Sequence, residues 1–177
     1  MRVIRQSDYR VMAWKNGGGT TTEIHVSRPG TGNFDWRVSI ATVNADGPFS
    51  IFPGYDRHIM VLDGMDMTLK VGDKGPFHLA PLEPFSFAGD AAVTGLLAHG
   101  PVRDFNLMVR REYGHGTLRV HQCADPYLVG SANAQHLVHI MDGDSILLEA
   151  GEVFTFAAGA KLAICEVSPH WRREPAA

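Results

Sequence analysis

Short segments of alternating or β-branched apolar residues recur along the whole chain. They cover residues 21–26, 36–43, 58–62, 67–71, 93–98, 105–110, 117–122, 135–141, 153–157 and 162–167. Turn clusters rich in Gly, Pro and Asp separate them. No segment keeps a 3.6-residue period for long, so we expect helix only as a turn or two, around residues 7–10 or 131–134. This spacing of short strands predicts an all-β sandwich or barrel.

The order of these segments repeats once. A strand ending in Asp63-Gly64 is followed by an aromatic segment at 85–89 and an apolar one at 96–98, and a strand ending in Asp142-Gly143 is followed by similar segments at 154–157 and 162–165. This is the plan of half a jelly roll, and two halves can cover each other's open faces. Chance recurrence of Asp-Gly turns and Phe-rich strands is the alternative.

The composition limits the classes of partner. At 177 residues with a net charge of −3, the chain suits one domain and has no global basic field for nucleic acid. No apolar run approaches the ~18 residues of a membrane span, and the N-terminus lacks the apolar stretch of a signal peptide. Cys123 and Cys165 lie in apolar runs, which is typical of reduced, buried thiols, and a disulfide between them is the alternative. We therefore expect a cytoplasmic protein that binds neither nucleic acid nor membrane, and leave open a homodimer formed by exposed strands.

Three of the predicted strands carry a polar row opposite an apolar row. The polar rows are Thr21, Glu23 and His25; Arg37, Ser39 and Ala41; and Asn106, Met108 and Arg110, whereas the clearest apolar rows are Trp36, Val38 and Ile40, and Phe105, Leu107 and Val109. The apolar rows are expected in the core. A polar row either faces solvent or lines an interior pocket, and the period of two does not separate these alternatives.

Four longer motifs resemble the HutD/Ves family. They are WKNGGGTTTEI at 14–24, FDWRVSIATV at 34–43, DGPFSIFPGYDR at 46–57 and DFNLMVRR at 104–111. The resemblance implies a double-cupin fold (a bicupin, or RmlC-like jelly roll) with two β-barrels sharing one compact core, the first unit at about 14–112 and the second at about 115–168, to which the N-terminal strand can contribute. It also implies an association with histidine-degradation genes and a role in sensing or buffering a small metabolite such as formiminoglutamate. Residues 114–177 match no family motif, so no function is carried over onto them.

The metal ligands of a typical cupin enzyme are missing from their expected positions. Such enzymes use a His-x-His pair, a Glu and a further His. The Glu position, seven residues before each turn glycine, holds Arg57 in the first unit and His136 in the second. His136 and His139 are three residues apart and so lie on opposite faces of a strand. We predict no metal and no cofactor, although a convergence of other, scattered histidines stays open.

The polar rows predict a pocket for an acidic ligand instead. Guanidinium groups bind carboxylates in two-point contacts, hydroxyls and amides add neutral donors, and a glutamate can pair with a cationic end of the ligand. The predicted ligand-binding residues are Lys15, Asn16, Thr21, Glu23, Arg37, Ser39, Arg57, Asn106 and Arg110. Arg37, Arg57 and Arg110 are expected to converge. The second pocket is expected to be filled by Phe154, Phe156 and Ile164.

The glycine run after Lys15 and Asn16 does not fit a phosphate-binding loop, because a Walker loop places lysine after its glycines and before a helix. Its glycines fit a close backbone approach at the rim of the pocket, with Lys15 or Asn16 reaching in.

A ligand binder is favoured over an enzyme, since neither cysteine has a neighbouring base and no Gly-x-Ser-x-Gly elbow exists. The alternative is a cupin isomerase or hydrolase, with or without a metal, that uses a Glu23–His25 or Asp56–His58 pair in acid–base catalysis.

Overall fold

The structure is a computed structural model that describes residues 1–15, 17–28, 30, 33–141 and 143–170. The strands are β1 (Arg2–Ile4), β2 (Arg10–Ala13), β3 (Gly19–Val26), β4 (Trp36–Val43), β5 (Gly47–Pro48), β6 (Tyr55–Asp63), β7 (Met67–Val71), β8 (Lys74–Leu79), β9 (Phe85–Ala88), β10 (Val93–Leu96), β11 (Val102–Arg110), β12 (Gly114–Gln122), β13 (Tyr127–Gly130), β14 (Gln135–Ile140), β15 (Ser145–Leu148), β16 (Val153–Phe156) and β17 (Lys161–Pro169). The helix among these residues is a single 3-10 turn, η1 (Gln6–Asp8). The prediction of an all-β chain is confirmed.

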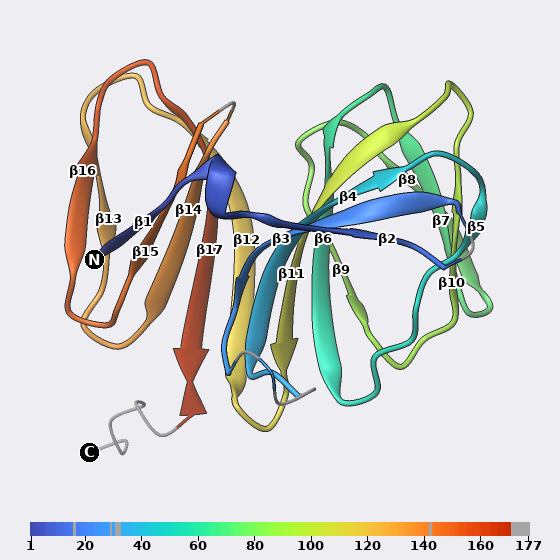
Figure 1. The fold of residues 1–177 in the computed structure, drawn as a ribbon, viewed down its shortest axis with the longest axis horizontal. Helices are drawn as coiled ribbons and strands as arrows, with labels where there is room; N and C mark the ends of the chain where they lie inside the picture. Colours follow the sequence, from blue (N-terminus) through green and yellow to red (C-terminus); the bar gives the residue numbers. More distant parts are fainter. Residues whose placement is uncertain (16, 29, 31–32, 142, 171–177) are drawn as a thin grey trace.

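The strands form four layers, which Figure 1 shows side by side. A five-stranded sheet (β1-β15-β14-β17-β12) and a six-stranded sheet (β2-β3-β4-β11-β6-β9) make the two inner layers. A two-stranded sheet (β13-β16) covers the outer face of the first, and a four-stranded sheet (β5-β10-β7-β8) covers that of the second. None of the sheets formed by the described residues closes on itself, so each half is a pair of facing sheets and not the closed barrel expected from the sequence.

Separate apolar cores fill the three spaces between these layers. The central core lies between the two large sheets and contains the apolar rows of β4 and β11, including Trp36, Val38 and Phe105. A second core joins the six- and four-stranded sheets, and a third fills the C-terminal half. The expected core rows are therefore confirmed, and the opposite face of β4 and β11 points away from the central core, toward the four-stranded sheet.

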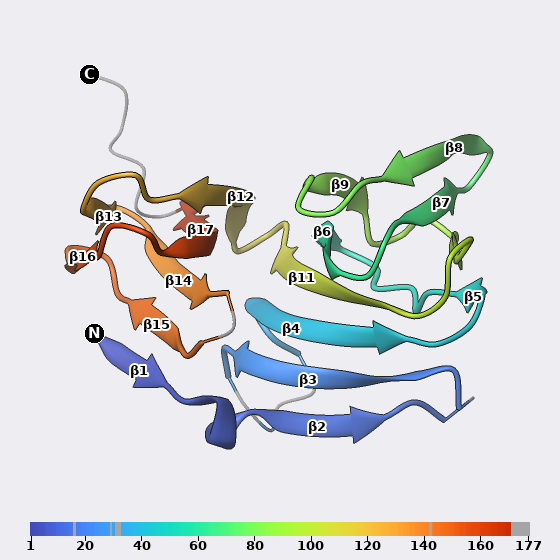
Figure 2. The same ribbon diagram turned by 90° about the horizontal axis from the view of Figure 1, so that it is seen from above.

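The N-terminal segment connects the two halves. Figure 2 shows β1 beside β15 in the C-terminal half, after which the chain passes through η1 and enters the N-terminal half as β2, beside β3. Gln6 fixes this crossing, because its backbone N–H donates to Asp144 and its side-chain amide donates to the carbonyl of Gly143. The first strand of the sequence thus completes the sheet that is built from the last strands.

The two halves share a strand order that differs in detail from the sequence repeat. In the large sheets β4, β11 and β6 are neighbours in one half, and β12, β17 and β14 are neighbours in the other. In the small sheets β10 pairs with β5 as β16 pairs with β13. The aromatic strand β9 instead pairs with β6 at the edge of the large sheet. The counterpart of β16 is therefore β10, and the match of the aromatic segments at 85–89 and 154–157 is wrong.

The sequence located most strands but missed several short ones. The expected ranges of β4 and β7 are correct and the N-terminal strand, expected without bounds, is β1, whereas β2, β5, β8, β13 and β15 were not predicted. Residues 131–134 form no helix. Both cysteines are free and buried, as expected. The described residues contain no helix with the length and apolar character that a membrane crossing would need.

Candidate functional site

A cavity of about 510 Å³ opens on the face of the six-stranded sheet that looks toward the four-stranded sheet. It is lined by Met12, Trp14, Lys15, Thr21, Arg37, Ser39, Ala41, Pro48, Phe49, Ser50, Phe52, Arg57, Asp104, Asn106 and Met108. Six of the nine residues predicted from the sequence are among these, namely Lys15, Thr21, Arg37, Ser39, Arg57 and Asn106. Members of the polar rows of three strands therefore line one cavity and do not simply face solvent.

Strand register explains how these residues meet. Residues paired across antiparallel strands point to the same face of the sheet. Met108 in β11 pairs with Arg37 in β4 and with Arg57 in β6, so the two guanidinium-bearing side chains start in one row across the sheet. In the next row Asn106 pairs with Ser39, and Ser39 pairs with Glu23.

Arg57 is almost fully buried, with 7% of its surface exposed. Its Nη2 donates to Asn106 Oδ1 at 2.9 Å, and its Nη1 donates to the Ser50 carbonyl at 3.3 Å. The guanidinium carbon also lies 5.0 Å from the ring centre of Phe87 and 5.5 Å from that of Phe49, within reach of cation–π attraction. Burial lowers the pKa of Arg57 to about 10, so the group stays cationic near neutral pH.

Asp104 also lines the cavity, beside Asn106, and was not predicted as a site residue. Its side chain is buried, and Oδ1 accepts a hydrogen bond from the Asn106 amide. Burial raises the pKa of the Asp104 carboxyl to about 7, while nearby Arg57 opposes this increase. A signal was present in the sequence: Asp104 opens the DFNLMVRR motif and stands two residues before Asn106, but the predicted strand began one residue too late to include it.

Arg37 is held by a carboxylate at the side of the cavity. Its Nε lies 2.8 Å from Glu23 Oε2, and both side chains are largely buried. Glu23 does not itself line the cavity. Among the described residues no other hydrogen bond or ion pair engages the Arg37 guanidinium, which leaves its terminal nitrogens available to a ligand.

Aromatic side chains contribute to the apolar part of the lining. The alternation of polar residues along the strands did not identify them. Trp14, Phe49 and Phe52 line the cavity, and Trp14 Nε1 donates to Thr21 Oγ1 at 2.8 Å. All three belong to the motifs that resemble the HutD/Ves family, and this was the signal in the sequence that could have identified them as lining residues. Lys15 is exposed and also lines the cavity, whereas Asn16 lies outside the described residues.

A β-bulge removes His25 from the row in which the sequence placed it. The pairing of β3 with β4 shifts between Glu23 and His25, so that His25 pairs with Val38 and faces the central core side. Its ring centre lies 4.4 Å from that of Trp36, and both residues line a second cavity of about 510 Å³ at the seam between the halves. Burial, with a smaller contribution from Arg2, lowers the pKa of His25 to about 4.

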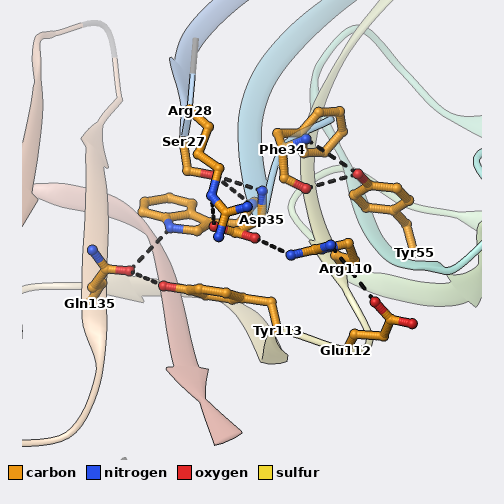
Figure 3. A network of polar contacts seen from close by, with 10 residues as sticks. Ser27, Arg28, Phe34, Asp35, Tyr55, Arg110, Glu112, Tyr113 and Gln135 are labelled. Atoms are coloured by element: carbon orange, nitrogen blue, oxygen red, sulfur yellow. Dashed lines mark hydrogen bonds and ion pairs between the residues drawn. The ribbon is translucent and has the colours of Figure 1, made fainter. Parts of the chain in front are cut away.

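Arg110 is also displaced from the predicted pocket. It belongs to the polar row of β11 but does not line the cavity beside Asn106 and Met108. Figure 3 shows its guanidinium pointing to Asp35, which also accepts an ion pair from Arg28, and to Glu112. The same view shows Gln135 Oε1 accepting a hydrogen bond from the Tyr113 hydroxyl, and Gln135 Oε1 also accepts one from Trp36 Nε1. The expectation that Arg110 would converge with Arg37 and Arg57 is therefore wrong, because its guanidinium is paired with Asp35 and Glu112 outside the cavity.

The pairs considered for acid–base catalysis do not line the cavity. The bulge separates Glu23 from His25, and His58 points to the opposite face of β6 from Arg57, where its Nδ1 lies 2.7 Å from Ser86 Oγ. Burial lowers the pKa of His58, against a smaller opposing effect of Asp56.

The donor set of the cavity does not fit a divalent metal. Its described lining offers one carboxylate, Asp104, with no imidazole or thiolate, beside the cations Lys15, Arg37 and Arg57. Across the described residues, no three His, Cys, Asp or Glu side chains are grouped so that they could hold a metal ion.

The corresponding face of the C-terminal half is mostly apolar. Where Arg57, Ile59 and Val61 pair with Met108, Asn106 and Asp104, the equivalent rows are His136 with Glu166, Val138 with Ile164, and Ile140 with Leu162. Ile164 and Phe156 are buried in the third core, and Phe154 packs against it, as expected. His136 Nε2 lies 3.5 Å from Glu166 Oε2. The polar pair Asn106 and Asp104 is thus replaced by aliphatic side chains in this half.

Comparisons with known proteins agree on one family. The family model described as HutD matches residues 6–170. An uncharacterized 21.2 kDa protein in the hutC 3' region of Pseudomonas putida is 39% identical over 142 residues, which cover 76% of this chain and 75% of that protein. The structure of HutD from Pseudomonas fluorescens SBW25 (formate condition) is 31% identical, with a TM-score of 0.81 over 96% of this chain and 98% of that one. A conserved protein of unknown function from Pseudomonas aeruginosa PAO1 is also 31% identical, with a TM-score of 0.69 over 96% and 92% of the two chains.

Proposed function

The chain belongs to the HutD family, and on that premise we propose that it binds a small acidic metabolite, formiminoglutamate or a related amino-dicarboxylate, in the cavity beside Arg37 and Arg57. Binding uses no metal. The HutD family is linked to histidine-utilisation genes, so the output of binding is regulation or buffering of a metabolite of that pathway.

The observation that carries this proposal is the row formed by Arg37, Met108 and Arg57 across three strands. It brings two cationic side chains to the lining of one cavity, with neutral donors at Ser39 and Thr21 and aromatic side chains beside them. A guanidinium in such a place favours a planar anion, because two parallel N–H groups match the two oxygens of a carboxylate. Arg37 is the better placed of the two, since Arg57 already donates to Asn106 and Ser50.

The fold supports a finer interpretation, in which the halves are two cupin units that share the central core. The common order β4-β11-β6 and β12-β17-β14, each with its small covering sheet, is what a duplicated jelly roll would produce. Only the first unit has kept a polar pocket under this proposal, since Leu162 and Ile164 occupy the positions of Asp104 and Asn106 in the second.

Calorimetric titration with formiminoglutamate and with glutamate tests the proposal. Arg37→Ala should bind about 10- to 100-fold more weakly, the effect of losing a charge-assisted hydrogen bond of roughly 1.5–3 kcal/mol. Arg37→Lys should restore little, because an ammonium group cannot reproduce a planar two-point contact. The matched control is Arg103→Ala, an exposed arginine of the neighbouring strand β11 that pairs with Asp63.

Equal affinity of the native protein and Arg37→Ala would place the bound anion elsewhere and defeat the proposal. The same samples separate a binder from an enzyme: recovery of unchanged formiminoglutamate after long incubation supports binding alone, whereas its conversion would favour the isomerase or hydrolase alternative. Metal analysis after dialysis should find less than one equivalent of Fe, Mn, Ni or Zn per chain.

A further inference from the structure

Asp104 lines the cavity, and one of its carboxylate oxygens has no hydrogen-bond partner among the described residues. The residue is 1% exposed and lines the cavity, and its Oδ1 accepts from Asn106 while its buried Oδ2 has no hydrogen-bond partner among the described residues. Ala41 and Val61, which flank it across the sheet, offer no side-chain donor. A buried acceptor without a partner is unfavourable, so a ligand donor at this point would recover free energy.

The nearby cation does not fill this role. Arg57 acts on Asp104 electrostatically, but its two terminal nitrogens donate to Asn106 Oδ1 and to the Ser50 carbonyl. Among the described residues no arginine or lysine nitrogen lies within 4.0 Å of the Asp104 carboxylate, the limit for an ion pair. Hydrogen bonds thus connect Arg57 to Asn106 and Asn106 to Asp104, so that the Asn106 amide separates the cationic group from the anionic one.

Glu23, the carboxylate expected from the sequence to meet a cationic ligand end, is occupied. It forms the ion pair with Arg37 Nε at 2.8 Å and does not line the cavity. Its position suits orienting the Arg37 guanidinium. The charged groups that do line the cavity are Lys15 before β3, Arg37 on β4, Arg57 on β6 and Asp104 on β11, so Asp104 is the one anionic group among the described lining residues.

We propose that Asp104 selects ligands that carry a cationic N–H group, an ammonium or amidinium, next to their carboxylate, and that it discriminates against simple dicarboxylates. This inference rests on the proposed function in using the same cavity. The ligand's N–H donates to Asp104 Oδ2 while its carboxylate meets Arg37. Because a cation beside a buried carboxyl favours the ionised form, such a ligand also fixes Asp104 as the carboxylate.

Glutamate and glutarate test this selection, since they share both carboxylates and differ by the ammonium group. In calorimetric titration the native protein should prefer glutamate by about 10-fold or more, the effect of one charge-assisted hydrogen bond. Asp104→Asn, which keeps the shape of the side chain, should bring this preference close to one. Glu23→Gln should weaken the binding of glutamate and of glutarate by the same factor and keep the preference for glutamate, because Glu23 acts through Arg37.

A measurement on the native protein covers the case in which Asp104→Asn does not fold. The carboxyl carbon signal of Asp104, followed by NMR against pH, should shift to a lower pKa with saturating glutamate, whereas glutarate should not lower it. Arg37-dependent binding of both probes with equal affinity in the native protein would overturn the inference and leave the proposed function standing, as would a preference that survives in Asp104→Asn. Binding of neither probe, nor of formiminoglutamate, would overturn both.

Discussion

The guanidinium of Arg57 and the carboxyl of Asp104 are linked through a third side chain, the amide of Asn106. Asn106 accepts from Arg57 Nη2 at 2.9 Å with its oxygen and donates to Asp104 with its nitrogen. Since an amide has one acceptor end and one donor end, this chain fixes the orientation of Asn106. It also keeps a cation close enough to Asp104 to restrain the upward shift of its pKa.

Replacing Arg57 should therefore raise the pKa of Asp104. In Arg57→Met the cation that favours the carboxylate is lost while burial remains, so Asp104 should titrate above its native value of about 7. NMR titration of the Asp104 carboxyl carbon measures this directly. Arg103→Met, on the exposed part of the same strand, should leave the titration unchanged, and an unchanged or lower pKa in Arg57→Met would contradict the electrostatic link.

Asp104 should make the protein less stable as pH rises. Its pKa is raised from 3.8 to about 7, so the folded state binds more protons than the unfolded state between these values. The free energy of unfolding then falls with rising pH across this window, by at most ~1.4 kcal/mol per pH unit from this group. His25 acts in the opposite sense: its pKa is lowered from 6.5 to about 4, so its contribution to stability rises with pH between about 4 and 6.5.

Comparison with Asp104→Asn isolates the contribution of Asp104. The unfolding free energy of the variant relative to the native protein should increase as pH rises from about 4 to about 7, and level off above. Urea denaturation at a series of pH values gives the difference. A difference that stays constant across that range would mean that Asp104 is ionised normally in the folded protein.

Gly19→Ala should destabilise the protein by about 1–3 kcal/mol. A Cβ atom at this position would lie 2.1 Å from the backbone oxygen of Thr42 and 3.1 Å from the Trp14 ring, so β3 could not keep its present approach to β4. Thermal melting measures the loss. The control is Gly47→Ala, where a Cβ meets no atom within 4 Å, and an equal effect of both changes would show that loss of the close approach is not the cause.

Trp36→Ala should cost ~3–5 kcal/mol of unfolding free energy, because it leaves a large cavity. Trp36 is 1% exposed, packs in the core between the two large sheets, and donates its indole N–H to Gln135 across the seam. Urea denaturation should show the loss, while Val11→Ala, at a position 66% exposed, should change stability by under ~0.5 kcal/mol. Unfolding in two separate transitions would show further that Trp36 couples the two halves.

The sequence by itself determined the strand class and much of the cavity lining. The alternation of residues along β4 and β11 has a physical cause, since successive side chains in a strand point to opposite faces. It therefore separated Trp36 and Val38, which lie in the central core, from Arg37 and Ser39, which line the cavity. The motifs that resembled HutD identified the family, which the comparisons show.

Only the tertiary structure decided which members of each polar row share a site. A bulge after Glu23 turned His25 to the other face of the sheet, and a single extra residue of this kind leaves no clear mark on the alternation pattern. Arg110 alternates along β11 with Met108 and Asn106 as expected, yet its guanidinium pairs with Asp35, which lies 75 residues away in sequence, and so stays out of the cavity. Asp104 lines the cavity, and its burial between apolar neighbours raises its pKa and leaves Oδ2 without a donor. Burial and pairing depend on residues that are distant in sequence, and these contacts arise only when the four layers are assembled.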